Sequence, residues 1–505
     1  MKCITLAALC LSLLTINAQK QVAAMPFEFE KDAFKKKTYG TYYLTDKTGE
    51  TFSYILKDNL KVSYILLNKD FKVIKRIDHT GFANTPFSQG NIVFYNGSAY
   101  QNKFNYVFKV KVPSSDIPDY YLIHTVDFNT AELTVKTLFT QPIIEKELIT
   151  FSNKGRFFHI NVLNEKKALH MRVISENGTF VEKIIPITLP PYIKQSTLSE
   201  YLKGLALALD ESSFDFPDTR SDAKLYVYDD RLSFVINWSC HPVYIFSISL
   251  NDFSIKYQAL NPFNEEIKFS KTSPLIQSVV MDNKLFSLST ENDKLRISVH
   301  DLKNDQLIKV FDIRQDFPRD SFAADPVKTE QRGKKRSESP VKDMIKEFKE
   351  MYKQDDAILV KKNKNGYYEI IFGMHRGLPS SNVRSDHTLT SVTMYGANLY
   401  PSNGNSTPRS VAVMRTMSSQ NGPNLYYYRV DVYNETVFRI NLRYNDLAIV
   451  KGSSSGLNYS PASDAYMERV SSKMDVTNHF TFNSKQYVAY YEKKEKQYII
   501  EEIIE

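Results

Sequence analysis

The sequence contains only three cysteines and a single tryptophan in 505 residues. Two of the cysteines, Cys3 and Cys10, lie in an N-terminal segment that we expect to be removed, which leaves only Cys240. A chain with one cysteine cannot form an intramolecular disulfide. The mature protein must therefore be held together by its apolar core, for which its 32 Tyr and 32 Phe provide the material.

The signatures of several kinds of chemistry are also missing. No His-Glu-x-x-His pair, calcium-binding loop, Gly-x-Ser-x-Gly elbow or glycine-rich phosphate loop is found. We therefore expect no metal and no cofactor. The formal net charge of +8 is spread along the chain, whereas a nucleic-acid interface requires a concentrated basic face. No segment after the N-terminus reaches the roughly 18 apolar residues of a transmembrane helix.

The N-terminus is typical of a secretory signal. Met1-Lys2 supplies a positive start, Ile4–Leu14 is an uncharged apolar run, and Ile16-Asn17-Ala18 ends in a small residue. The apolar run is too short to anchor the chain in a bilayer. We expect cleavage after Ala18 and export to the periplasm or the extracellular space, with a leader that resembles those of Gram-negative bacteria.

Short segments rich in Tyr, Phe, Val and Ile recur along the rest of the chain, each bounded by Asn, Asp, Gly or Lys. Alternating apolar residues between turn residues predict strands with one face half-buried. The segments are Val62–Leu67, Tyr106–Val112, Lys224–Ile236, Tyr244–Leu250, Lys294–Leu302, Tyr426–Val432 and Gln486–Tyr491. Only two stretches have a helical pattern, so the sequence predicts an all-β protein.

A weak repeat connects these segments: an apolar strand, a turn of Asn, Asp or Lys, and a closing strand. Copies lie at residues 65–74, 248–255, 299–308 and 430–437. The closing strands are predicted to begin near Phe71, Leu133, Phe180, Phe253, Leu307, Val437 and Tyr498. Most successive starts are about 47 to 73 residues apart, a period typical of four-stranded units with loop insertions.

This organisation resembles the β-propeller superfamily, although the WD40, sialidase and kelch signatures are absent. The resemblance implies one propeller over residues 39–505, after a signal peptide (1–18) and an N-terminal lead-in (19–38). It implies about seven four-stranded blades, with six to eight compatible with the spacing. The alternative architecture is two tandem β-sandwich domains.

Two short helical insertions interrupt the strands. In the first, over residues 194–212, Thr197-Leu198-Ser199-Glu200 forms a capping box. The apolar face of that helix is predicted to comprise Leu198, Tyr201, Leu202, Leu205 and Leu209.

The second insertion, over residues 314–356, combines a charged segment with a helix. Lys328–Ser339 lacks apolar residues and predicts a mobile surface loop. Ser339 is the predicted cap of a helix over residues 341–352, with Pro340 at its first position. The helix packs on its own domain, or the insertion is an arm that binds an acidic partner or an anionic surface. The residues of that arm are Lys334, Lys335, Arg336, Ile345 and Phe348.

The densest group of reactive side chains follows an apolar strand at residues 367–372. His375 or His387 could act as a general base, oriented by Asp386. Arg376 and Arg384, with Arg409 in a second polar loop at residues 402–424, could bind an anion. An ordinary surface loop has the same spacing. His159 and His170 lie inside apolar strands and are typical of structural histidines.

The sequence favours an exported propeller that acts as a protein-binding or scaffold module, in a cell-envelope or surface complex. Propellers present a broad rigid face ringed by loops, which suits recognition. The alternative is an extracellular hydrolase or lyase that acts on a polysaccharide. A glycan ligand is compatible with either interpretation, and whether the protein is an enzyme stays open.

Overall fold

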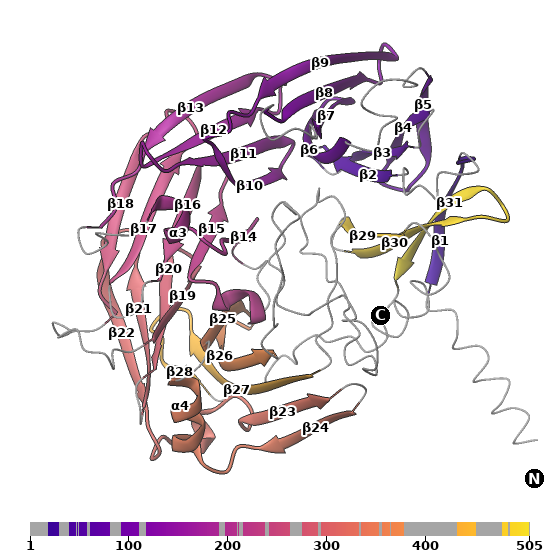
Figure 1. The fold of residues 1–505 in the computed structure, drawn as a ribbon. Coiled ribbons are helices and arrows are strands. Elements are labelled where there is room, and N and C mark those ends of the chain that lie inside the picture. Colours follow the sequence, from indigo (N-terminus) through magenta and orange to yellow (C-terminus); the bar gives the residue numbers. More distant parts are fainter. Residues whose placement is uncertain are drawn as a thin grey trace, which may run out of the picture.

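The strands of the protein form small, mainly antiparallel sheets that follow one another along the chain. The computed structural model describes residues 19–29, 40–46, 48, 50–57, 61–80, 92–110, 118–190, 197–209, 211, 216–237, 242–262, 275–290, 294–332, 335–352, 356–363, 365–377, 432–450, 477–482 and 485–503. Within these ranges the strands form seven sheets, which we number as blades 1 to 7. Figure 1 shows the sheets placed around a common centre.

Blades 1 to 5 follow the chain order. Blade 1 contains β2 (Gly40–Thr45), β3 (Thr51–Lys57), β4 (Lys61–Asn68) and β5 (Val73–Thr80). Blade 2 contains β6 (Ile92–Tyr100), β7 (Lys103–Val110), β8 (Tyr120–Asp127) and β9 (Glu132–Thr140). Blade 3 contains β10 (Lys146–Asn153), β11 (Arg156–Leu163), β12 (Ala168–Ile174) and β13 (Phe180–Pro186). Blade 4 contains β14 (Ala206–Ala208), β15 (Ala223–Val227), β16 (Arg231–Ile236), β17 (Val243–Ser249) and β18 (Ile255–Leu260). Blade 5 contains β19 (Leu275–Met281), β20 (Lys284–Thr290), β21 (Leu295–Asp301) and β22 (Gln306–Ile313).

The last two blades use strands from distant parts of the chain. Blade 6 contains β23 (Val327–Arg332), β24 (Lys335–Pro340), β25 (Asp356–Lys362), β26 (Tyr367–Gly377), β27 (Val432–Arg443) and β28 (Ile449–Val450). Blade 7 contains β29 (Thr477–Phe482), β30 (Lys485–Glu492), β31 (Gln497–Ile503) and β1 (Gln19–Pro26). In the described residues the helices are α3 (Leu198–Tyr201), α4 (Met344–Tyr352) and the 3-10 turns η1 (Phe216–Arg220) and η2 (Arg319–Ser321).

Neighbouring blades bury each other's faces. The innermost strand β6 contacts both β2 and β10 of the neighbouring blades. In β3 every residue after Thr51 is buried, and in β4 every residue between Lys61 and Asn68 is buried. Only the outermost strands, such as β5, keep an exposed face. The inner strands are thus covered on both faces, whereas the sequence pattern predicted strands with one half-buried face.

Shared aromatic clusters join successive blades. The rings of Tyr42 in blade 1 and Phe94 in blade 2 lie 4.6 Å apart, and those of Tyr54 in blade 1 and Tyr498 in blade 7 lie 5.4 Å apart. Two separate sandwich cores would not connect the last sheet to the first. The protein is a single β-propeller, and the predicted seven blades are confirmed.

The ring is closed by the N-terminal strand. β1 pairs antiparallel with β31 at the outer edge of blade 7, with Met25 opposite Tyr498. Residues 19–26 of the predicted lead-in are therefore part of the propeller, so the predicted lower bound at residue 39 is too late. The side chain of Met25 is 1% exposed, in a cluster with residues of blades 1 and 7.

The repeat located the outer strands of blades 1 to 5, whose starts lie within two residues of the predicted ones. For the last two blades the prediction was wrong. Val437 lies inside β27 and Tyr498 inside β31, and both of these are third strands from the centre. The outer positions are taken by β23 and β24 in blade 6 and by β1 in blade 7, which precede their blades in the sequence.

One backbone feature of the repeat recurs in the turns between the third and fourth strands. In blades 1 to 5 each of these turns has one residue in the left-handed region of the backbone, with φ between 60° and 82°. The residues are Phe71, Ala131, Gly178, Phe253 and Asp305. A bulky residue is strained there. At Phe71 the conformation is retained because the ring is 5% exposed and packs at 5.0 Å from that of Phe52.

The charged segment of the second insertion is not a loop. Lys328–Ser339 was predicted to be mobile, but most of it forms the β23–β24 hairpin, which pairs with β27. Pro340 belongs to β24, so it is not the first residue of the helix. α4 starts at Met344, and the Asp343 carboxylate accepts the backbone N–H of Lys346. The cap predicted at Ser339 was therefore wrong.

The first helix has the predicted capping box, in which the Thr197 hydroxyl and the Glu200 carboxylate exchange bonds with each other's backbone. Its length differs from the expectation. α3 ends at Tyr201, and Ala206–Ala208 forms β14, parallel to β15. Leu198, Tyr201 and Leu202 are buried, and the other two predicted face residues, Leu205 and Leu209, pack partly buried against the same cluster.

We predict that Met25→Ala destabilises the protein by about 3 kcal/mol, because it leaves a cavity where β1 closes the ring. The measurement is the urea-induced unfolding of the purified chain. Lys20→Ala, at an exposed position of the same strand, is the matched control and should change the stability by less than about 0.5 kcal/mol. Equal stability of Met25→Ala and the wild type would contradict closure by β1.

Candidate functional site

The two edges of the blades carry connections of different length. Turns of two to five residues join the first strand to the second, and the third to the fourth. Most connections of more than five residues leave the opposite edge, including 81–91, 261–274, 378–431 and 451–476. The exceptions are the segment between β14 and β15 and the segment 341–355, which leaves β24 toward the short-turn end of blade 6. We call these edges the short-turn face and the long-loop face.

The predicted reactive cluster begins at the long-loop face, where β26 ends. His375 pairs with Glu435 of β27, and Arg376 pairs with Asn434. Just before them, Gly373 has φ 151°, and a Cβ there would lie 1.8 Å from the Thr436 carbonyl oxygen. Only glycine allows the two strands to approach so closely.

The other members of that cluster cannot be placed. Arg384, Asp386, His387 and Arg409 lie outside the described residues, and so do the side chains of His375 and Arg376. Whether these groups meet stays a prediction. Of the predicted partner-binding arm, Lys334 lies outside the described residues, and Lys335 and Arg336 are in β24. Phe348 is fully buried in the core cluster of blades 5 and 6, so it cannot bind a partner, and Ile345 is partly buried.

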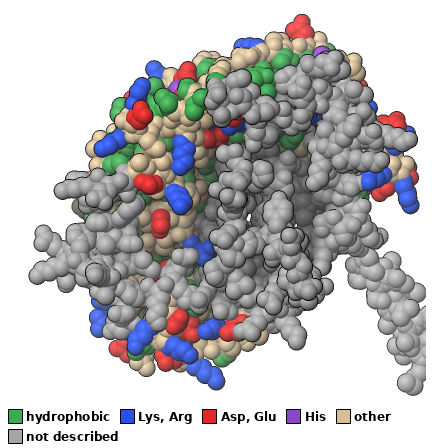
Figure 2. Space-filling model, in the orientation of Figure 1, with side chains coloured by type: hydrophobic (Ala, Val, Ile, Leu, Met, Phe, Trp, Pro, Cys, Tyr) green, Lys and Arg blue, Asp and Glu red, His purple; other side chains and the backbone are tan. Residues whose placement is uncertain are grey.

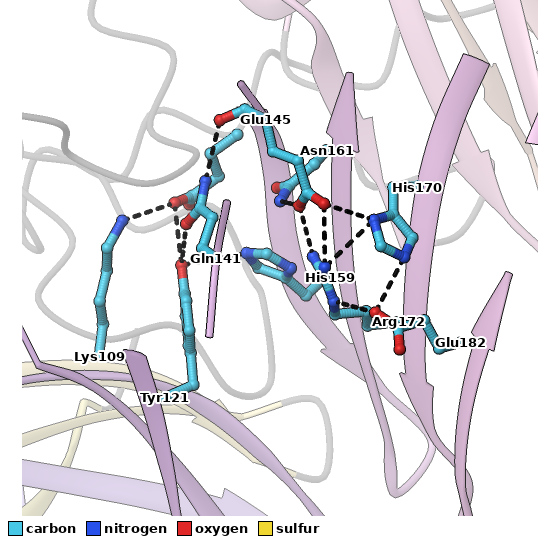
Figure 3. A network of polar contacts seen from close by, with 10 residues as sticks. Lys109, Tyr121, Gln141, Glu145, His159, Asn161, His170, Arg172 and Glu182 are labelled. Atoms are coloured by element: carbon cyan, nitrogen blue, oxygen red, sulfur yellow. Dashed lines mark hydrogen bonds and ion pairs between the residues drawn. The ribbon is translucent and has the colours of Figure 1, made fainter. Parts of the chain in front are cut away.

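The structure instead reveals a polar network between blades 2 and 3, beneath the long-loop face (Figure 3). Its blade 2 side is built around Glu147 at the start of β10. The Glu147 carboxylate accepts the Tyr95 hydroxyl at 3.0 Å and pairs with the Lys109 ammonium at 3.2 Å. Both charged side chains are less than a tenth exposed, and Asp119 pairs with the same ammonium at 3.2 Å. Tyr121 donates to Gln141 at 2.9 Å, and burial raises the pKa of its hydroxyl.

The blade 3 side of the network is centred on Glu145, whose side chain is 3% exposed. One carboxylate oxygen accepts from Arg172 Nη1 at 2.7 Å, and the other accepts from Arg172 Nη2 at 3.1 Å. Asn161 and His170 donate at 2.6 and 2.7 Å. Burial opposes the charge of Glu145, but bonds from His170, Arg172 and Asn161 outweigh it and lower the pKa to about 2. His170 and Arg172 also reach Glu182, which is 44% exposed.

Two buried histidines complete the seams between blades 1, 2 and 3. His159 Nε2 lies 3.1 Å from the Tyr121 hydroxyl, and His124 Nδ1 lies 2.6 Å from the Tyr64 hydroxyl. Both side chains are 0% exposed. Burial lowers the pKa of His159 well below its usual value and, with a smaller contribution from His79, that of His124 to about 3. Structural roles for His159 and His170 agree with the sequence interpretation.

A third buried group lies between blades 4 and 5, again towards the long-loop face. The Lys224 ammonium donates to the Ser221 carbonyl at 2.5 Å and to Gln277 Oε1 at 3.1 Å. Burial lowers the pKa of Lys224 to about 7, against the attraction of Asp222. Gln277 donates in turn to Asp222 at 3.1 Å.

These charged residues were missed by the sequence analysis. The available signal was a charge within an apolar strand, as in Phe108-Lys109-Val110, Met171-Arg172-Val173 and Ala223-Lys224-Leu225. Ionised side chains are rarely buried unless they are paired. In the described part of the chain each of these ions has its partners within the fold, so the network joins blades to one another.

Comparison with known proteins gives no family. No protein-family model matches the sequence, and no curated protein is significantly similar to it. Solved structures with some likeness include a prolyl endopeptidase at 8% identity, which matches over 90% of this chain and 46% of that one with a TM-score of 0.30. A puromycin-hydrolysing peptidase of Mycobacterium tuberculosis is 11% identical over 89% and 50% of the two chains, with a TM-score of 0.28. The WD40 domain of SCAP from fission yeast is 9% identical over 85% and 99%, with a TM-score of 0.25.

The chain spans about half the length of those peptidases. The propeller assignment rests on the sheet topology. Across the described ranges, no three His, Cys, Asp or Glu side chains gather as metal ligands would. Nor does that part of the chain include a helix with the length and hydropathy of a membrane span.

We predict that Glu145→Gln destabilises the protein by about 3 kcal/mol, because the Arg172 guanidinium stays buried with only a half-exposed partner. Chemical unfolding at neutral pH measures the loss. The matched control is Glu182→Gln, on the exposed side of the same guanidinium, which should cost less than about 1 kcal/mol. Similar losses in both variants would show that burial of the Glu145 pair has no special weight.

We predict that His124 makes the protein less stable as the pH falls. The unfolded histidine binds a proton below about pH 6.5, whereas the folded one resists protonation until about pH 3. Within that window each pH unit should cost up to about 1.4 kcal/mol. His124→Gln removes this term, so its urea midpoint should fall less between pH 7 and pH 4 than that of the wild type. The same fall in both proteins would refute the assignment.

Proposed function

We propose that this protein is an exported β-propeller whose long-loop face binds a protein partner. One observation carries the proposal: most of the long connections leave one edge of the blades, whereas the other edge carries mainly turns of two to five residues. A rigid ring of sheets fixes the roots of those connections, while the connections themselves are free to vary in sequence. Recognition surfaces are commonly built from such loops on a rigid scaffold.

The described part of the long-loop face includes an exposed apolar pair. Ile143 and Ile144 lie in the connection between blades 2 and 3, and each is 67% exposed. The next residue is Glu145, whose bonds fix the end of this connection to blade 3. Figure 2 shows further hydrophobic side chains along the rim where β9 and β13 lie, and Val135 and Ile184 of those strands are 44% and 49% exposed. Exposed isoleucines on a fixed loop are suited to a protein interface.

Export is supported by the N-terminal sequence, with its positive start and the apolar run Ile4–Leu14. A cut after Ala18 would keep all of Gln19–Pro26, the described closing strand. The fold with its single remaining cysteine also needs no disulfide to form.

We predict that Ile143→Ser/Ile144→Ser weakens partner binding at least tenfold, which corresponds to about 1.4 kcal/mol, because two apolar contacts are lost. Cross-linking and mass spectrometry on the envelope and secreted fractions of the native host identify the partner. Binding to the purified partner is then measured. Cross-links are expected from Lys166, in a long-loop-face connection, and the chain is expected to begin at Gln19.

The matched control is Val73→Ser/Ile74→Ser, a second exposed aliphatic pair, 51% and 53% exposed, beside a turn of the short-turn face. It should leave partner binding unchanged. Equal effects of the two variants, or cross-links confined to the short-turn face, would overturn the proposal. Turnover of a polysaccharide that is lost in His375→Ala would favour the hydrolase or lyase alternative instead.

A further inference from the structure

A groove opens on the short-turn face between blades 4 and 5. Its volume is about 400 Å³, and residues of both blades line it. Blade 4 contributes Arg231, Ser233, Ser247 and Lys256, and blade 5 contributes Leu302 and Lys303. A volume of this size lies within the usual range for small-molecule sites.

Small polar side chains form the floor of the groove. In the seam between blades 1 and 2, by contrast, Tyr64 and Tyr106 pack with their rings 5.5 Å apart. The face of blade 4 that lines the groove carries Ser233 on β16 directly opposite Ser247 on β17. Their hydroxyls cannot reach blade 5, and the gap stays open.

The floor of the groove offers hydrogen-bonding groups for a hydroxylated ligand. The Ser233 and Ser247 oxygens are 2.7 Å apart, so one hydroxyl hydrogen joins them and the other is left for a ligand. The amide nitrogen of Gln258 donates to the Leu302 carbonyl at 2.8 Å and to the Asp305 carboxylate. Its side-chain oxygen is left as an acceptor in the groove. Gln258 is 9% exposed, so its position is fixed.

The charge of the lining favours an anion. Arg231 is held 4.0 Å above the Tyr228 ring by bonds to Asp230 at 3.2 Å and Asn283 at 3.4 Å. Lys256 and Lys303 line the groove as well, and no ion pair joins either ammonium to an acid of the described chain. Among the lining residues, three cations thus stand with one carboxylate, that of Asp230, which already pairs with Arg231, and the Asp305 carboxylate beside the groove is bonded to Gln258.

Apolar side chains complete the lining. Val235 and Ile245 of blade 4 and Leu302 of blade 5 are among the groove residues; the first two are buried and Leu302 is partly buried. A sugar ring has C–H groups that pack on aliphatic side chains and hydroxyls that bond to serine and amide groups. An acidic sugar adds a carboxylate for the arginine and lysines.

We propose that the groove binds a saccharide that carries a carboxylate, such as a uronic acid. The carboxylate lies at Arg231, Lys256 and Lys303. The sugar hydroxyls bond to the Ser233–Ser247 pair and to Gln258, and the ring packs against Leu302. The groove and the long-loop face are on opposite edges of the blades, so this inference does not depend on the proposed protein partner.

Isothermal titration of the whole mature chain with glucuronate, glucose and inorganic phosphate tests the proposal. Glucuronate should bind at least tenfold more tightly than either of the others. Ser233→Ala/Ser247→Ala removes both hydroxyls of the pair, so neither is left without its partner. This variant and Arg231→Gln should each weaken glucuronate binding about tenfold, the effect of losing one hydrogen bond to a charged or hydroxyl group.

The matched control is Ser287→Ala/Ser298→Ala, a buried cross-strand serine pair in blade 5 that does not line the groove. It should leave glucuronate binding unchanged, which separates the loss of the groove hydroxyls from a general loss of stability. Phosphate that binds as tightly as glucuronate, serine variants without effect, or no binding of glucuronate would each overturn the proposal. An oligosaccharide of uronates that binds more tightly than the monomer would identify a polymer as the source of the sugar.

Discussion

The structure depends on one constraint: each sheet has two apolar faces, and each face must be covered by another sheet. Strands such as β3 and β4 are buried along almost their whole length, so a sheet that lost one neighbour would expose aromatic rings to water. A row of such sheets has two uncovered ends. The only arrangement that covers every face with copies of the same unit is a closed ring, and the pairing of β1 with β31 closes it.

The same constraint explains why so much charge is buried. Where blades 2 and 3 meet, the seam is wide enough for Lys109, Glu145 and Arg172, but only because each ion has a partner within the seam. Pairing one buried carboxylate with a bidentate guanidinium fixes the distance and angle between donors and acceptors more strictly than apolar contacts do. The bonds that cross the seam, from Tyr95 and Lys109 of blade 2 to Glu147 of blade 3, set how the two blades lie against each other.

The sequence predicted what is local and repeated. The Asn-Lys-Asp-Phe turn before β5 and the Asn-Asp-Phe turn before β18 mark the start of an outer strand, because the phenylalanine must adopt the same left-handed backbone in both. The capping box at Thr197 was equally visible. Long-range choices were not. Nothing in Val327–Arg332 indicates that it pairs with β27, a hundred residues further along the chain, rather than forming a loop. Likewise Gln19–Pro26 could be assigned to blade 7 only from the structure.

The site followed the same division. His375 was correctly expected at the end of an apolar strand. Its predicted partners lie in loops, and residue spacing does not predict whether the side chains of two loops come within hydrogen-bond distance. The buried ions were in principle readable, since a charge inside an apolar strand must find a partner. The sequence could not identify that partner. Glu145 lies just before β10 and Arg172 lies in β12, so the pair forms only once blade 3 is folded.

A ring of blades also separates the surfaces that stabilise the fold from those that can bind a partner. The faces of the sheets are buried between blades, so only the two edges and the outer strands are accessible for recognition. On the long-loop face the connections can change without disturbing a strand, because they begin and end outside the hydrogen-bonded ladders.

The short-turn face has no such freedom, and a binding site there must come from the seam itself. Ser233 and Ser247 line such a site, the groove between blades 4 and 5. Small residues in a seam leave room for a ligand, at the cost of the apolar contact that larger residues would have made.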